Sequence, residues 1–147
     1  MAARIISTVI SIMMVVYIIC LGFFFFQHQS IQENVEQLNY NADELVSTSG
    51  VLDSNTYRRL IDSISIYGDF SVQLKYEKQI KPGVYDTYFD TADILDKTLS
   101  KGDRLTIYIE GKDTTIFGRL ISVPFIGYLS KHKADIRIRS VKSCIKT

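Results

Sequence analysis

The stretch IISTVISIMMVVYIICLGFFFFQHQS, residues 5–30, decides the fold because it changes from apolar to polar within one residue of Phe26. Its first 22 residues, 5–26, carry no charge, and only the small hydroxyl side chains of Ser7, Thr8 and Ser11 interrupt the apolar run. The hydrocarbon core of a bilayer is about 30 Å thick and needs about 20 helical residues, whereas buried core helices and signal-peptide apolar regions are usually shorter. The sequence therefore predicts a transmembrane helix over 5–26.

A cleaved secretory signal is the alternative interpretation of this run. Such a signal carries several basic residues before the apolar region and small residues at its cleavage site. Here only Arg4 precedes the run, and the bulky side chains of Phe23–Phe26 occupy the position where a peptidase would cut. Cys20 follows Ile19, where a lipoprotein would have a small residue. We therefore expect the segment to remain in the mature protein.

The residues that flank the run predict its orientation. Arg4 and the terminal amine precede it, whereas Gln27, Gln29 and Glu33 follow it. Positive charge close to a membrane helix is retained in the cytoplasm. We therefore expect a single-pass membrane protein whose residues 1–4 are cytoplasmic and whose residues after the span are extracytoplasmic.

Beyond the membrane segment, residues 27–49 show the pattern of an amphipathic helix. Neither Gly nor Pro interrupts the chain between Phe23 and Ser49, so the membrane helix is expected to continue and to end before Gly50. The apolar residues now form one stripe, which a folded domain should cover. The residues expected to pack against that domain are Ile31, Val35, Leu38, Ala42 and Leu45.

The remaining residues, 50–147, suit one small extracytoplasmic domain with its own core. Asp53 or Ser54 can cap the start of a first helix, and Leu105, Ile107 and Ile109 alternate on one side of a strand. Helical spacing of apolar residues and strict alternation predict the elements of this domain. These are helices over 53–68 and 90–99, and strands over 70–80, 104–110, 114–123 and 134–141, with a loop at Pro82 and Gly83 and a hairpin turn at 111–113. The expected fold class is α+β: a long N-terminal transmembrane and amphipathic helix, then a small antiparallel β-sheet domain with one or two short helices.

Charge is distributed unevenly along the chain although the net charge is only +1. Seven acidic residues and two arginines between 31 and 69 give a balance of −5, and residues 129–147 give +5. Opposite charges at the two ends of an extracytoplasmic domain can steer one subunit onto the next. The alternative is that both are ordinary solvated faces. The basic residues proposed as a subunit-contact patch are Lys131, Lys133, Arg137, Arg139 and Lys142.

Residues suited to catalysis or to metal binding are sparse. The two cysteines, Cys20 and Cys144, are not expected to form a disulfide, because one lies in the membrane run and the other near the far terminus. Asp90, Asp93 and Asp96 have two interpretations, as a cation site or as residues that stabilise the start of a short helix, and we favour the second. We therefore expect no enzyme, no cofactor and no metal, and nucleic acid is an unlikely partner.

Three stretches carry a resemblance to a known group of proteins. They are ISTVISIMMVVYIICLGFFFF (6–26), LVSTSGVLDSNTYRRLIDSISIYGDFSVQLKY (45–76) and LSKGDRLTIYIE (99–110). The chain resembles type IV pilins and pseudopilins, in particular the Tad-type minor pilin-like proteins of Gram-positive bacteria. The resemblance implies a structural subunit of a cell-surface pilus-like filament or of a secretion pseudopilus. It also implies partners: copies of the chain or related pilin-like subunits, membrane lipid, an assembly ATPase and platform proteins.

In such a filament the hydrophobic N-terminal helix packs into the core. Type IV pilins carry a glutamate near the start of this helix, whereas this chain has no carboxylate before Glu33. Small residues four positions apart, Ser7 and Ser11, let membrane helices approach closely, although serine is also simply tolerated in such helices. The residues expected in the filament core are Ser7, Ser11, Phe23, Phe24, Phe25 and Phe26. The alternative is a single-pass accessory or binding component of a surface or transfer complex that does not polymerise.

Overall fold

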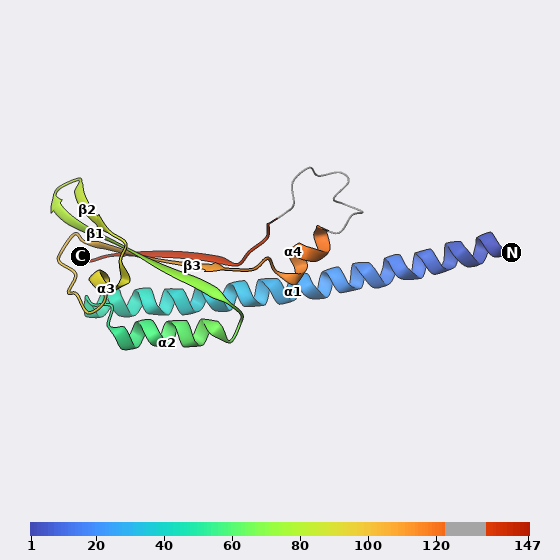
Figure 1. The fold of residues 1–147 in the computed structure, drawn as a ribbon, viewed down its shortest axis with the longest axis horizontal. Coiled ribbons are helices and arrows are strands. Elements are labelled where there is room, and N and C mark those ends of the chain that lie inside the picture. Colours follow the sequence, from blue (N-terminus) through green and yellow to red (C-terminus); the bar gives the residue numbers. More distant parts are fainter. Residues whose placement is uncertain (123–134) are drawn as a thin grey trace. The chain divides into compact units, whose positions relative to one another are not determined.

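The computed structural model describes residues 1–122 and 135–147, without the side chain of Ala2 (Figure 1). In chain order the elements are α1 (Ala2–Ser49), α2 (Ser54–Ser65), β1 (Phe70–Lys81), β2 (Val84–Tyr88), α3 (Thr91–Ile94), β3 (Arg104–Gly111), α4 (Ile116–Ile121) and β4 (Arg139–Ile145). They form two compact units, one of Met1–Ser30 with Thr114–Ile136 and the other of Ile31–Asp113 with Arg137–Thr147. The predicted α+β fold class is confirmed.

The long helix α1 is continuous across the predicted change from membrane run to amphipathic stripe. It ends where the sequence predicts, because Gly50 adopts a φ of 74°, a left-handed conformation that favours glycine. The Gly50 N–H donates to the carbonyl of Val46 at 2.7 Å, which satisfies one of the carbonyl groups left open at the end of the helix.

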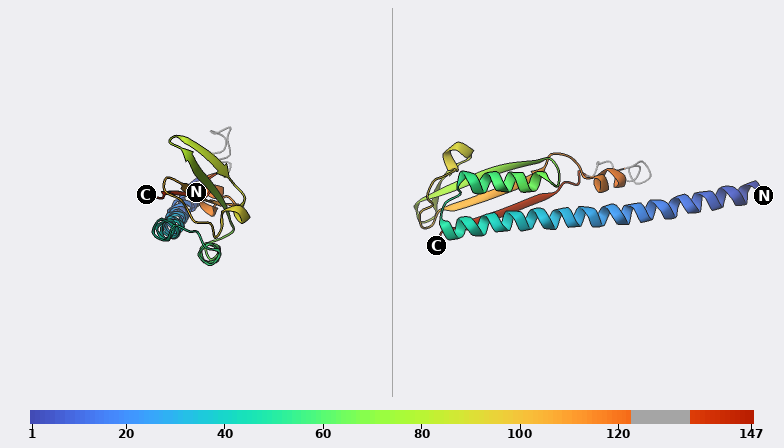
Figure 2. Two further views of the ribbon diagram at one scale, coloured as in Figure 1. Left: turned by 90° about the vertical axis from the view of Figure 1, so that its left-hand side faces the viewer. Right: turned by 90° about the horizontal axis from the view of Figure 1, so that it is seen from below.

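The second unit contains an antiparallel sheet with strand order β2-β1-β3-β4. The part of α1 in this unit, residues 31–49, lies beside α2 on one face of the sheet (Figures 1 and 2). Strand alternation supplies the core between them: Leu105, Ile107 and Ile109 of β3 are buried, as are Leu74 and Tyr76 of β1. The predicted one-sided pattern of residues 105, 107 and 109 is confirmed.

Helix α2 follows from local sequence signals. The side chain of Asp53 accepts a hydrogen bond from the Thr56 N–H at 2.9 Å, as an N-cap residue does. Hydrogen bonding by the Thr56 side chain, together with this bond from its N–H, lowers the pKa of the Asp53 carboxyl below its usual range. Leu60 and Ile64, one turn apart, are the buried residues of α2. The predicted helix start is therefore confirmed, with Asp53 rather than Ser54 as the cap.

The structure corrects two of the predicted elements, one strand and one loop. Residues 116–121, expected in a strand, form helix α4, which begins at the cap residue Thr115, whose side chain accepts from the Gly118 N–H at 3.2 Å. A Cβ added to the buried Gly118 would lie 3.0 Å from the Cβ of Ile136. Helix α4 therefore packs closely against the chain at Ile136. The segment after Pro82 and Gly83, expected in a loop, instead forms β2 and pairs with β1.

Two further boundaries differ from the prediction. The helix expected over 90–99 is a single turn, α3, capped by Asp90. The C-terminal strand was expected over 134–141, but β4 begins only at Arg139 and extends to Ile145. The part of that expected strand before Asp135 lies outside the described residues.

Candidate functional site

The N-terminal half of α1 leaves its apolar side chains uncovered. Of the described helices, α1 is the one long and apolar enough to cross a membrane. The bare face carries Ile5, Ile6, Val9, Ile10, Ile12, Met13, Met14, Val15, Val16, Ile18, Ile19, Phe23, Phe25 and Phe26 as exposed hydrophobic residues. Ser7 and Ser11 are exposed on the same half. An apolar helix with exposed side chains on all sides needs an apolar environment from outside the chain.

The four phenylalanines at the end of this half do not share one environment. Phe23 and Phe26 are exposed, and Phe24 is half-buried. The ring of Phe25 meets that of Phe117 from α4 edge to face, with centroids 5.3 Å apart. Within the first unit, α4 therefore supplies part of the apolar cover that this segment was expected to need.

Two more contacts hold α4 against α1. The Tyr17 hydroxyl donates to the carbonyl of Leu120 at 2.9 Å. The ring of His28 lies 5.9 Å from that of Phe117. These contacts join residues about one hundred positions apart in sequence. The local sequence pattern does not indicate them, and it predicts a strand rather than a helix over residues 116–121.

The C-terminal half of α1 is covered by the second unit. Val35 and Ala42 are fully or almost fully buried, and Ile31 and Leu38 pack against the same core, as predicted. The prediction was wrong for Leu45, which is 57% exposed, while its neighbour Val46 is completely buried. A spacing of four rather than three after Ala42 keeps the stripe on the side of the sheet, because a helix turns once every 3.6 residues.

Polar side chains of α1 join this half to strand β4. The amide of Gln32 donates to the carbonyl of Arg139 at 2.7 Å and accepts from its N–H at 3.3 Å. The buried Asn39 side chain donates to the Ser140 hydroxyl at 2.9 Å. These hydrogen bonds favour one position of α1 along β4, since a shift would break them, including the bond between the buried Asn39 and Ser140 side chains.

A carboxyl and a thiol meet at the same interface. Burial raises the pKa of the Asp43 carboxyl, although the neighbouring Cys144 thiol and the Lys142 ammonium act to lower it. Burial and the neighbouring Asp43 raise the pKa of the Cys144 thiol to about 11. Cys144 is therefore a buried thiol with little thiolate character at neutral pH, which makes it a structural residue rather than a nucleophile.

The proposed basic patch divides into several environments. Lys131 and Lys133 lie outside the described residues. Arg139 forms an ion pair of 2.9 Å with Glu110, and Lys142 lies over the ring of Tyr40 at 6.0 Å from its centroid. Arg137 is half-buried.

The charged regions also lie differently from the expectation. The acidic stretch and the basic C-terminal segment were expected at opposite ends of the domain, but β4 lies against the acidic half of α1. Part of their charge complementarity is thus satisfied within one chain.

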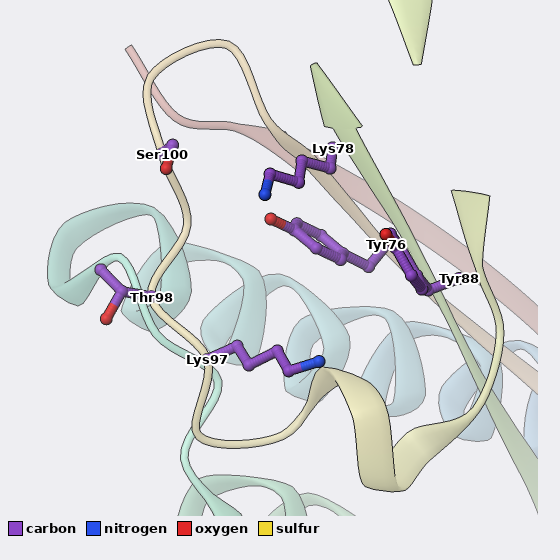
Figure 3. A pocket seen from close by; sticks show the side chains of 6 residues that line it. All are labelled: Tyr76, Lys78, Tyr88, Lys97, Thr98 and Ser100. Carbon is purple, nitrogen blue, oxygen red and sulfur yellow. The ribbon is translucent and has the colours of Figure 1, made fainter. Parts of the chain in front are cut away.

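A small cavity of about 280 Å³ opens at the β1–β2 end of the sheet (Figure 3). Figure 3 shows the ring of Tyr76 between the side chains of Lys78 and Lys97, and this ring stacks on that of Tyr88 with centroids 5.8 Å apart. The cavity is lined by Tyr76, Lys78, Tyr88, Lys97, Thr98 and Ser100.

The Tyr76 hydroxyl is already used within the protein, because it donates to the buried Asp103 carboxylate at 2.7 Å. Asp103 also accepts from the N–H groups of Gln79, at 2.9 Å, and Ser100, at 2.8 Å. Burial acts to raise the pKa of the Asp103 carboxyl, but these three hydrogen bonds outweigh it and lower the pKa below its usual range. Burial and the bond to Asp103 raise the pKa of Tyr76. The arrangement ties the turn before β3 to β1.

The three aspartates considered as a cation site have separate local roles. Asp90 caps α3 by accepting from the Ala92 N–H at 3.0 Å, and Asp93 lies in the first turn of that helix. Asp96 accepts from the Ser54 N–H at 2.9 Å. Among residues 1–122 and 135–147 no three His, Cys, Asp or Glu side chains gather closely enough to hold a metal ion.

Comparison of the chain with known protein families, curated proteins and solved structures found no match. The inference of function therefore depends on the geometry of the chain itself. Its main feature is one helix whose two halves have opposite surroundings. Residues 5–26 are largely exposed, apart from those that α4 contacts, whereas one face of residues 31–46 is buried by the second unit.

Proposed function

We propose that the chain is a structural subunit of a pilus-like filament or of a secretion pseudopilus. The observation that carries the proposal is the bare half of α1, continuous with a half that anchors a folded α+β unit. In a bilayer the bare half would be covered by lipid, and in a filament by the same halves of neighbouring subunits. Close packing of these apolar side chains against neighbouring helices would hold the filament together, so no catalytic residue is needed.

The proposal includes an orientation and partners. Residues 1–4 would be cytoplasmic, with Arg4 on the positive side of the span, and the second unit would be extracytoplasmic. The partners would be copies of this chain or related subunits, with an assembly ATPase and platform proteins supplying energy. A single-pass accessory protein that never polymerises uses the same bare helix only as an anchor, and it is the competing function.

Shearing of cells that produce the full chain tests the two functions against each other. A filament subunit is released with high-molecular-weight surface material, whereas retention of all the protein in the membrane fraction would overturn the filament proposal. The double variant Phe23→Ser, Phe26→Ser should reduce release more than membrane insertion, because both rings are exposed to whatever covers the helix. Ile66→Ser is the matched control, since Ile66 is also highly exposed but lies beyond the end of α2.

A further inference from the structure

Helix α4 lies beside the last part of the bare half of α1, within the first unit. Its contacts begin at Tyr17, whose hydroxyl reaches the carbonyl of Leu120, and end at Phe25 and His28, which meet the ring of Phe117. Tyr17 and Phe25 are eight positions apart, about 12 Å along a helix. The segment expected to span the bilayer therefore shares about a third of its length with a second element.

The backbone around α4 is unsuited to a hydrocarbon environment. A helix of six residues cannot pair its first N–H groups or its last carbonyl groups internally. Thr115, Tyr17 and Ser122 satisfy some of them: the Thr115 side chain accepts from Gly118, Tyr17 donates to Leu120, and the Ser122 hydroxyl donates to the Gly118 carbonyl at 2.7 Å. Backbone N–H and C=O groups at the ends of a short helix are unfavourable in contact with lipid chains, because no water is present there to pair with them.

The side chains of α4 fit the boundary between lipid and water instead. Ile116 is 54% exposed, Phe117 is half-buried against α1, and Arg119 in the last turn is exposed. Apolar side chains that enter the acyl boundary, combined with a basic side chain at the level of the lipid phosphates, are typical of interfacial helices. Tyr17 has the character of a membrane-belt residue, with an apolar ring and a hydroxyl that reaches a polar group.

We propose that α4 is an interfacial element that lies in the lipid headgroup layer beside residues 17–28 of α1. The proposal rests on the membrane span of the proposed function, and it moves the outer boundary of that span. The hydrocarbon part of α1 then ends between Tyr17 and Phe25, which leaves about 17 residues from Ile5 to Leu21, the lower limit for crossing a bilayer. The partner of this surface is the phospholipid headgroup.

Because the chain contains no tryptophan, a single introduced tryptophan reports the depth of its own position in a bilayer. The full chain carrying Ile116→Trp is reconstituted into phosphatidylcholine vesicles whose lipids are brominated either near the headgroup or near the chain ends. Bromine quenches only indoles close to it, so the two lipids report depth. We expect quenching of I116W to be at least about twofold stronger with the shallow bromines, since interfacial helices bury their apolar face about 5–10 Å deep.

Two further single-tryptophan variants separate failure of this proposal from failure of the membrane span. Ile10→Trp probes the middle of the span and should be quenched most by the deep bromines, whereas Ile66→Trp, in the second unit, should be quenched by neither. If I116W is quenched no more than I66W while I10W is quenched deeply, the interfacial role of α4 is overturned and the span stands. If I10W is not quenched, both fail.

Two other outcomes also contradict the proposal. Strongest quenching of I116W by the deep bromines would place α4 in the hydrocarbon core. A blue-shifted I116W emission that neither bromine quenches would mean that protein covers α4, as a second copy of the chain would.

Discussion

The two halves of α1 contain similar residues but differ in what surrounds them. Val16 in the first half is exposed, whereas Val35 in the second half is completely buried against the sheet. The first half therefore obtains its apolar environment from outside the chain, and the second obtains it from its own domain. One continuous helix therefore lies in two different environments. The same substitution should have different consequences in each half.

The matched pair Val35→Asp and Val16→Asp gives the largest expected effect. Val35→Asp leaves an unpaired charge in the core and should lower the free energy of unfolding by about 3–5 kcal/mol, measured by denaturant titration of the detergent-solubilised chain with circular dichroism. Val16→Asp should leave that transition unchanged and reduce membrane retention, because a carboxylate near the centre of a span costs about 3 kcal/mol. If V16D unfolds the domain as V35D does, the two halves are not independent.

Much of this contrast is local and could be predicted from the sequence. The absence of charge over 5–26, the stripe beginning at Ile31, the cap at Asp53 and the alternation of β3 are patterns of neighbouring residues. Strand β2 was missed because all five of its side chains are exposed, so it lacks the alternation of buried and exposed positions by which a half-buried strand is recognised.

The errors at α4 and at the candidate site have a different cause. Residues 114–123 are rich in β-branched and aromatic residues, which favour a strand locally, but packing of Phe117 against Phe25 and of Gly118 against Ile136 decides for a helix. Those contacts connect distant parts of the chain, and local patterns carry no information about them. The position of β4 against α1, which changes the meaning of the basic patch, is unpredictable for the same reason.

The next largest effect is expected at Asp103, in the covered unit. Asp103→Ala removes the acceptor of three hydrogen bonds and leaves the Tyr76 hydroxyl and two backbone N–H groups without it. We expect the free energy of unfolding to fall by about 2–4 kcal/mol, measured by the same titration. Thr98→Ala, on the exposed rim of the same cavity, is the control and should have no comparable effect. Equal stability of D103A and the unmodified chain would contradict the structural role of Asp103.

A smaller effect separates two neighbours at the end of α1. Val46→Ala should lower the free energy of unfolding by about 2 kcal/mol, because it removes buried methyl groups and leaves a cavity. Leu45→Ala removes a larger side chain but should change the free energy of unfolding by less than about 0.5 kcal/mol, since Leu45 is exposed. Greater destabilisation by L45A would restore the stripe expected from the sequence and move the covered face of α1 by one residue.

The smallest effect concerns the pH dependence of two carboxyls in the second unit. The pKa of Asp103 is lowered on folding, so its ionised form stabilises the fold above its unfolded pKa, and this contribution is lost as the pH falls through the folded value. The pKa of Asp43 is raised, so the folded state keeps its proton to higher pH, and stability is lost as the pH rises from the unfolded pKa through the folded one.

Single substitutions to asparagine should therefore give pH profiles of opposite sign. Relative to the unmodified chain, Asp43→Asn should gain stability as the pH rises above about 4, whereas the deficit of Asp103→Asn should shrink as the pH falls below about 4. Denaturation midpoints measured across this range test both directions. Parallel profiles would mean that the Cys144 thiol and the Lys142 ammonium outweigh burial at Asp43. The interface between α1 and β4 would then favour a charged carboxylate, and Asp43 would join Asp103 among the groups whose ionisation stabilises the covered half.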